Sequence, residues 1–199
     1  MELKKQLNEC IDRWALLRHP FYQAWESGEL SVAALKSYAS EYGAFISLLP
    51  LGWETIADED TANEEREHIA LWQQFAYGLD TEVSAAQLPA VADLVAKASA
   101  LFGRPEAALG AMYAFEAQQP ATAKSKLDGL RKHYNLPGGE RYFLAHANNQ
   151  HEAAKLLEQL VALPAAERTV ALDACEQMSA ALWNALTDIY DAHKQQVGA

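Results

Sequence analysis

The sequence predicts an all-α protein, a compact multi-helix bundle in which one domain spans residues 1–199. Three observations predict this class. Apolar residues recur three and four positions apart, which is the period of an amphipathic helix. Prolines, glycines and capping residues interrupt this pattern at intervals typical of helices. No segment has the alternating β-branched pattern that indicates a strand. Half of the 199 residues are apolar, so the chain can bury a sizeable core.

The first part of the chain contains four segments with helical spacing. Leu3, Leu7 and Ile11 mark the apolar face of the first segment. The pair His19-Pro20 interrupts the helical pattern after this segment. Pro20 is favoured at the first position of the second helix. Ser31 is a natural N-cap for the third segment. Acidic residues near the start of the fourth suit the positive end of a helix dipole. The expected helices cover Glu2–Leu17, Pro20–Gly28, Ser31–Leu49 and Asp58–Leu79.

The second part of the chain continues this pattern, which gives seven to nine helices in all. Gly103 separates two helices, and Pro105 and Pro120 are each favourable at a first helical position. The turn residues NLPGG and the segment ALPAAE mark the remaining boundaries. The expected helices cover Ser84–Phe102, Pro105–Gln119, Pro120–Tyr134, Glu140–Val161 and Ala165–Gln196.

Composition excludes several function classes. The net charge of −11 argues against nucleic acid or an anionic membrane surface as the main partner, because both attract clustered lysine and arginine. The sequence has neither an apolar segment of signal-peptide length near Met1 nor a membrane-spanning one, so we expect a cytoplasmic protein. Cys10 and Cys175 lack a Cys-x-x-Cys spacing and are expected to be reduced thiols.

Glu116 is the most unusual residue of the sequence, because it is a carboxylate on an otherwise apolar and aromatic helix. Burying an unpaired carboxylate costs several kcal/mol, so Glu116 is expected to meet a cation, a hydrogen-bonding cluster or a metal. A salt bridge with Arg13 or Lys126 would explain Glu116 without any chemistry. Lys124 is a further candidate for this countercharge.

Two histidines are candidate metal ligands. His68 follows Glu65 by three positions and Glu64 by four, so either carboxylate can share a helix face with it, and Glu-x-x-His pairs bind metal in carboxylate-bridged iron bundles. The alternative is a solvated acidic face with an internal ion pair. His146 has no strong ligand on its own face of a continuous helix, and His151 is turned away. The alternative for His146, and likewise for His151, is an ordinary histidine on the protein surface.

Three separated blocks carry a family resemblance. They read HPFYQAWESGELSVAALKSYASEY near the start, HIALWQQFAYGL in the middle, and YAFEAQQPATAKSKLDGLRKHY with YFLAHANN later. They resemble the TenA, PqqC and CADD superfamily, which has the heme-oxygenase-like fold. The chain is most similar to the CADD-like iron-containing redox proteins, over about residues 16–156. Function varies more than fold in this superfamily.

The CADD-like pattern implies a di-iron site at the centre of the helical bundle. His68, Glu116 and His146 match three of its ligand positions. The other three positions are occupied by Thr61, Gln150 and Ala153.

These departures leave an incomplete ligand set, for which Glu64 or Glu65 is an available replacement carboxylate. His68, His146 and Glu116 alone have the composition of a mononuclear non-heme iron site, two histidines and one carboxylate. The same three residues could equally form a metal-free polar remnant. The cofactor implied is therefore iron, with a mononuclear site as one arrangement and the number of ions left open, or no metal at all.

The resemblance implies an iron-dependent oxidoreductase or oxygenase that acts on an unidentified small molecule and forms a homodimer. In CADD-like proteins a tyrosine and a lysine near the metals take part in the oxidation. The corresponding candidates here are Tyr22, Tyr42 and Tyr113, which line the pocket, and Lys126 as a neighbouring charge. The alternative is a non-catalytic small-molecule-binding protein on the same scaffold.

Two other branches of the superfamily are disfavoured. The TenA thiaminases carry a nucleophilic cysteine on the helix that here reads GAMYAFE, and this sequence has no cysteine there. The PqqC branch relies on a pocket rich in histidine and arginine that this sequence does not offer. Heme binding also lacks support, because His19 belongs to the block that the other branches share.

Overall fold

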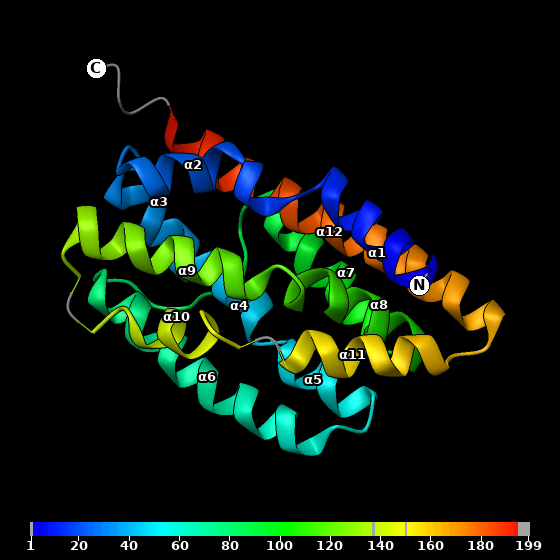
Figure 1. Ribbon diagram of the computed structural model, residues 1–199. Helices are drawn as coiled ribbons and strands as arrows, with labels where there is room; N and C mark the ends of the chain where they lie inside the picture. The colour runs from blue at the N-terminus through cyan, green and yellow to red at the C-terminus, as the bar shows by residue number, and fades with distance from the viewer. Residues whose placement is uncertain (1, 137, 150, 195–199) are drawn as a thin grey trace.

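The computed structural model describes residues 2–136, 138–149 and 151–194, which form helices joined by turns, without a strand among them. Figure 1 shows these helices packed side by side, with α12 along one edge of the view and α6 along the other. The all-α prediction is confirmed. The α-helices are α1 (Glu2–Arg13), α2 (Pro20–Ser27), α3 (Val32–Ser37), α4 (Gly43–Ile46), α5 (Leu49–Thr55), α6 (Glu59–Gly78), α7 (Pro89–Leu101), α8 (Pro105–Glu116), α9 (Gln119–Gly129), α10 (Arg141–His146), α11 (His151–Ala162) and α12 (Ala165–Lys194). A 3₁₀ turn covers Leu16–Arg18, and π-helical turns cover Tyr38–Tyr42 and Leu130–Tyr134.

Helix α8 is the central element of the bundle. Every residue from Ala107 to Glu116 is buried, and the helix makes its most extensive contacts with α12. Gly110 allows this close approach, because a Cβ atom there would lie 1.9 Å from the carbonyl oxygen of Ala171 on α12. Close packing of α8 on all sides places its last residue, Glu116, in the interior.

Gly110→Ala is therefore expected to destabilise the fold. The added methyl group would meet backbone rather than a flexible side chain, so α8 and α12 would have to separate. We expect the free energy of unfolding to fall by about 3 kcal/mol, measured by urea denaturation. Gly103→Ala is the matched control, because its Cβ would lie no closer than 3.4 Å to any neighbour. Equal stability of the two variants would contradict this packing.

The predicted helix ends agree with the structure where capping residues mark them. Gly28 ends α2 in the left-handed conformation, with φ of 77°. The Ser31 hydroxyl accepts a hydrogen bond from the amide of Ala34 at 3.1 Å and caps α3. Asp58 caps α6 by accepting a hydrogen bond from the amide of Thr61 at 3.1 Å. These caps confirm the starts of α3 and α6 and the end of α2.

The structure describes twelve α-helices rather than seven to nine. Two predicted helices are interrupted, and α5 is not predicted. Its proline, Pro50, indicates a stop in the sequence, yet it stands in the first turn of α5, where it has no hydrogen-bond partner to lose. Helix α7 begins at Pro89 rather than Ser84. The carboxylate of Glu41 accepts hydrogen bonds from two amides of the preceding segment, at 3.0 and 2.7 Å, and holds that segment in a non-helical conformation.

The most consequential difference lies after His146. The predicted helix Glu140–Val161 is wrong as a continuous element, because α10 ends at His146 and α11 begins at His151. The side chain of Asn149 stabilises the break. Its oxygen accepts a hydrogen bond from the amide of His151 at 3.2 Å, and its nitrogen donates to Glu152 at 2.7 Å. Gln150 lies outside the described residues. Because of this interruption, the residues of α11 that face His146 differ from those that a continuous helix would place there.

Two further expectations can be compared with the described residues. Both cysteines are free and buried, as expected of reduced thiols in the core. Among residues 2–136, 138–149 and 151–194, no helix combines the length and the apolar character needed to cross a bilayer.

Candidate metal centre

Five side chains from four helices meet in the interior of the bundle. They are Glu65 and His68 on α6, Glu116 on α8, His146 on α10 and Glu152 on α11. The four side chains other than His68 are almost completely buried, with exposed fractions of 1–2%. His68 is 16% exposed. Residues far apart in the sequence therefore form a compact cluster of carboxylates and imidazoles.

The five residues form two donor groups that share Glu65. One group contains Glu65, His68 and His146, and the other contains Glu65, Glu116 and Glu152. In each group, one donor atom per residue lies within 4.8 Å of the others. The Oε1 atom of Glu65 is 3.2 Å from Nδ1 of His68 and 3.9 Å from Nε2 of His146. Glu65 thus occupies the position of a carboxylate shared by both groups.

Several of these buried donor atoms have no hydrogen-bond partner within residues 2–136, 138–149 and 151–194. They are Oε2 of Glu65, both carboxylate oxygens of Glu116 and Nε2 of His146. The other nitrogen of His146, Nδ1, lies 2.7 Å from the carbonyl oxygen of Tyr142. A carbonyl can only accept, so Nδ1 donates its proton to Tyr142, and Nε2 is the ring nitrogen that faces Glu65 and is left for a metal. A backbone partner of this kind orients many metal-binding histidines.

Burial favours the protonated form of two of the three carboxylates in the cluster. Burial raises the pKa of Glu116 well above its ordinary value, and the carboxylates of Glu152 and Glu65 raise it further. Burial likewise raises the pKa of Glu152. Burial raises the pKa of Glu65 as well, but His146 and His68 outweigh this effect and lower it overall. A metal cation among the three carboxylates would allow all of them to be ionised.

The donor set fits a first-row transition metal such as iron. Three carboxylates and two imidazoles are the ligand types of carboxylate-bridged iron sites in helical bundles. Partnerless buried oxygen and nitrogen atoms are costly unless a cation binds them. Another donor group, formed by Glu64, His151 and Glu152, is mostly exposed and lacks this feature.

The predicted salt bridges of Glu116 are wrong. Arg13 pairs with Glu176 on α12 instead. Lys126 donates its hydrogen bond to Tyr38, and Lys124 pairs with Asp128. None of the three cations therefore compensates Glu116.

The alternatives for the other candidates can be judged in the same way. The solvated acidic face is wrong for Glu65, which is buried, whereas Glu64 is exposed as that alternative expects. The surface alternative is wrong for His146 but describes the exposed His151. Of the two replacement carboxylates, Glu65 lies with the histidines. Glu116 belongs instead to the second donor group.

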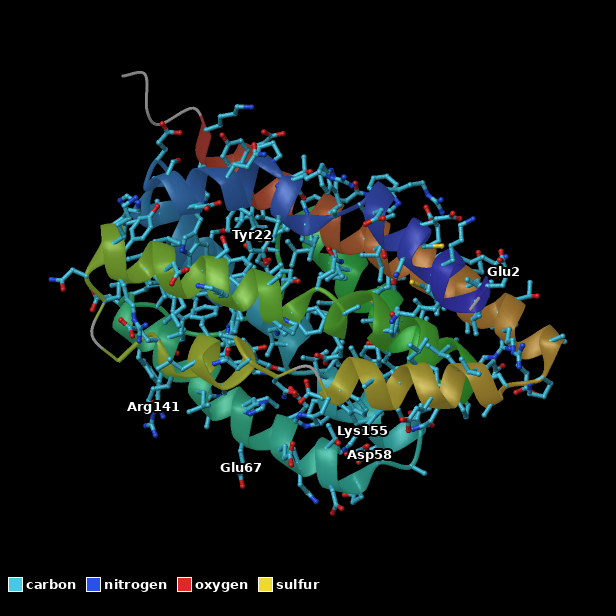
Figure 2. All side chains as sticks on the ribbon, viewed as in Figure 1. Glu2, Tyr22, Asp58, Glu67, Arg141 and Lys155 are labelled. Carbon is cyan, nitrogen blue, oxygen red and sulfur yellow. The ribbon has the colours of Figure 1, made fainter. Side chains whose placement is uncertain are left out.

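The positions at which the family resemblance calls for further ligands have other roles. Thr61 is buried and its hydroxyl accepts a hydrogen bond from Lys155 at 2.7 Å. Lys155 also pairs with Asp58 at 3.1 Å, where α11 faces the start of α6 (Figure 2). Ala153 lies in the wall of a cavity beside Glu116. Glu152 supplies the donor that sequence reasoning misses, because a continuous helix would turn it away from His146. The run ANNQ is the signal for the break, since asparagine favours turns.

The predicted catalytic lysine lies in a separate buried cluster. Lys126 is 2% exposed and its amine donates a hydrogen bond to the hydroxyl of Tyr38 at 3.2 Å. Its nitrogen is 5.5 Å from the ring centroid of Tyr22, which lies in the interior near its label in Figure 2. Burial lowers the pKa of Lys126 to about 7. Sequence reasoning selects Tyr42, which stacks on Tyr38 at 4.8 Å, but does not single out Tyr38 itself.

Aromatic rings connect this lysine cluster with the donor groups. The ring centroid of Tyr142 is 4.3 Å from that of His146 and 4.8 Å from that of Trp72. Trp72 lies 5.4 Å from Tyr38. Tyr113 is placed differently. Its hydroxyl is 3.4 Å from Asn8, and its side chain lines the cavity that reaches Glu116.

Comparisons with known proteins agree with this geometry. The sequence signature of a family described as iron-containing redox enzymes matches residues 51–184. A 4-aminobenzoate synthase of Chlamydia pneumoniae is 30% identical over 94% of both chains. A 4-aminobenzoate synthase of Nitrosomonas europaea is 30% identical over 94% of this chain and 91% of its own.

Solved structures confirm the fold. A heme oxygenase-like domain of unknown function from Shewanella denitrificans superimposes with a TM-score of 0.77 at 18% identity, covering 100% of this chain and 95% of its own. A TenA homolog from Pseudomonas syringae gives a TM-score of 0.76 at 13% identity, covering 94% and 90%. At these identities the likeness concerns fold alone.

Proposed function

This chain belongs to the family of iron-containing redox enzymes, and from that premise we propose that it is an iron-dependent oxidoreductase acting on a small molecule. One observation carries the proposal. The carboxylate of Glu65 is shared by two buried donor groups that contain partnerless donor atoms on His146 and Glu116. Without a metal, burial would keep the carboxyl group of Glu116 protonated, and Nε2 of His146 would have no partner among the residues that the structure describes.

Within this proposal, Glu65, His68 and His146 hold the first iron ion. Glu116 and Glu152, with the shared Glu65, supply oxygen donors for a second ion. Bound iron would supply the activation of dioxygen that the oxidation requires. The backbone carbonyl of Tyr142 holds the imidazole of His146 in the tautomer that can bind metal.

We further propose that the product is 4-aminobenzoate or a closely related aromatic amine. The support is the name of relatives that are 30% identical over 94% of this chain. The buried amine of Lys126 is suited to accept a proton during such an oxidation. With a pKa near 7 it is neutral in a large fraction of molecules and can then accept a hydrogen bond from the phenol of Tyr38, 3.2 Å away. Burial raises the pKa of Tyr38 well above its ordinary value, so the phenolic proton would pass to Lys126 only when the Tyr38 ring is oxidised.

A second candidate function is a binding protein that has lost catalysis. The observation that favours it is the hydrogen bond from Lys155 to Thr61, which places an ammonium group at a position where the family resemblance calls for a carboxylate ligand. Metal content distinguishes the two functions.

The experiment is elemental analysis of protein purified without chelators and of protein loaded anaerobically with ferrous iron. We expect at least one iron per folded chain and oxygen consumption when a reductant is added. When a small-molecule extract supplies the substrate, we expect 4-aminobenzoate by mass spectrometry. Iron that stays substoichiometric after loading would overturn the oxidoreductase proposal. Stoichiometric iron with oxygen consumption but without 4-aminobenzoate would overturn only the product.

A further inference from the structure

A cavity of about 640 Å³ leads from the protein surface to the candidate metal centre. It lies between α1, the junction of α8 and α9, and α11. Exposed residues such as Lys4 and Lys124 form its outer part, and the buried Glu116 forms its inner end. The cavity therefore connects solvent with a residue whose two carboxylate oxygens have no hydrogen-bond partner in the described part of the chain.

The outer part of this cavity is positively charged, unlike the chain as a whole. The chain has 27 acidic and 16 basic residues, yet the charged side chains in the lining are Lys4, Lys124 and Glu116. Lys124 pairs with Asp128 at 2.8 Å, but both side chains are mostly exposed, so this pair is weak and solvent-screened. An anion at the mouth would meet these two ammonium groups, whereas Glu116, the carboxylate among the described lining residues, lies at the inner end.

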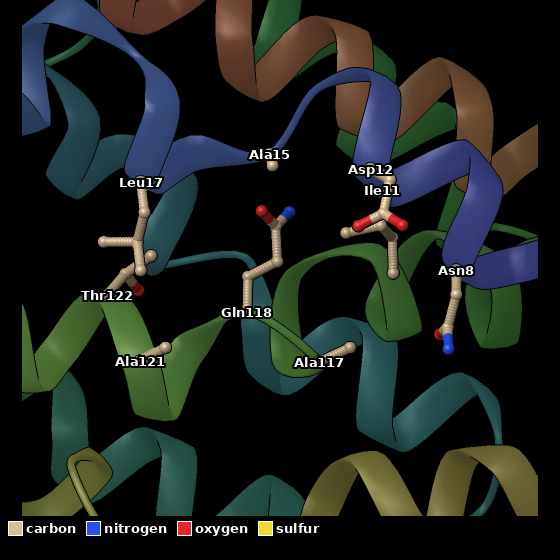
Figure 3. Close-up of a pocket in the computed structure, with 9 residues that line it drawn as sticks. All are labelled: Asn8, Ile11, Asp12, Ala15, Leu17, Ala117, Gln118, Ala121 and Thr122. Atoms are coloured by element: carbon tan, nitrogen blue, oxygen red, sulfur yellow. The ribbon is translucent and has the colours of Figure 1, made fainter.

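Small apolar side chains form the walls. Ala117, Ala121 and Ala153 are among the residues that leave the space open. A neighbouring cavity of about 300 Å³, drawn in Figure 3, shares Ala117, Ala121 and Asn8 with the first and extends to Thr122 and to the carboxylate of Asp12. The hydroxyl of Tyr113 lies 3.4 Å from Asn8, a long hydrogen bond that a ligand can replace. The walls thus suit an apolar body with few polar contacts.

We propose that this cavity binds a small organic monocarboxylate, with its carboxylate near Lys4 and Lys124 and its apolar body against the alanine walls. The cavity is also the route by which this monocarboxylate reaches the candidate metal centre, at whose edge Glu116 lies. The identity of the natural ligand rests on the proposed function, because 4-aminobenzoate is itself an aromatic monocarboxylate. The cavity and its charges do not depend on that identity.

The test compares benzoate with benzamide, two probes that share a ring and differ in charge. Dissociation constants are measured by NMR titration on metal-free and on iron-loaded protein. We expect benzoate to bind more tightly than benzamide. The double variant Lys4→Gln/Lys124→Gln should weaken benzoate binding about tenfold and leave benzamide binding unchanged. Lys5→Gln is the matched control, because Lys5 is on the same helix but outside this lining.

A second variant tests the location without changing charge. Ala121→Leu should fill the space shared by both cavities and weaken binding of both probes, with helicity and iron content unchanged. Equal binding of benzoate and benzamide, or an unaltered benzoate affinity in the lysine double variant, would overturn the inference. Iron content is measured on the same samples. Lysine-dependent benzoate binding without iron would therefore overturn the proposed function alone, and iron without benzoate binding would overturn this inference alone.

Discussion

Replacing Glu65 with glutamine should remove most of the iron that the protein binds. Glu65 belongs to both donor groups, and the change replaces a shared carboxylate by a neutral amide of the same size. We expect iron per folded chain to fall at least about tenfold, because loss of a ligand exceeds the effect of losing an outer-shell partner. The measurement is elemental analysis after anaerobic loading and desalting, with circular dichroism to check the fold.

Glu67→Gln is the matched control. Glu67 is on the same helix, exposed and directed away from the bundle in Figure 2, and it belongs to neither donor group. Its iron content should equal that of the parent. Similar losses in both variants would mean that iron binds to the acidic surface of α6 rather than in the interior.

Lys126→Met should stop formation of 4-aminobenzoate while iron content stays the same. The amine of Lys126 touches Tyr38 but belongs to neither donor group, so its removal deletes proton transfer and leaves the centre in place. A positioned general base contributes on the order of 100-fold to 10,000-fold, so we expect product to fall at least about 100-fold. Lys132→Met is the control, because Lys132 is exposed and belongs neither to the donor groups nor to the cavity lining. Retained product in Lys126→Met would contradict the role of Lys126.

The same variant should change how stability depends on pH. Burial lowers the pKa of Lys126 from 10.5 to about 7 in the folded protein. Between these values the unfolded chain binds the proton and the folded chain does not, so the free energy of unfolding rises with pH over this range. Below about pH 7 both states are protonated and the burial penalty is complete. Urea denaturation from pH 7 to 10 should show this rise in the parent and a smaller rise in Lys126→Met.

The sequence predicts the fold well because its helix ends depend on local chemistry. Gly28, Ser31 and Asp58 act within one turn of the residues that they cap, so their effect is visible in the sequence alone. The start of α7 is different. It depends on Glu41, more than forty residues earlier, whose carboxylate holds the preceding amides. Tertiary contacts of this kind have no local signature.

The centre was predictable only in part for the same reason. His68 and Glu65 are three positions apart on one helix, so spacing alone pairs them. Glu152 joins them because Asn149 stabilises an interruption of the helix after His146. A continuous helix would have placed Ala153 and Gln150 on the same face as His146 instead. The position of Lys126 beside Tyr38 and away from Glu116 depends on how α9 packs against the rest of the bundle.

Diffraction data collected at the iron absorption edge from iron-loaded crystals would test the central claim most directly. An anomalous peak should lie within bonding distance, about 2 Å, of donor atoms of Glu65, His68 and His146. A second and weaker peak is expected between Glu65, Glu116 and Glu152. Iron bound only at the exposed Glu64 and His151, or no peak in crystals of correctly folded protein, would contradict the account.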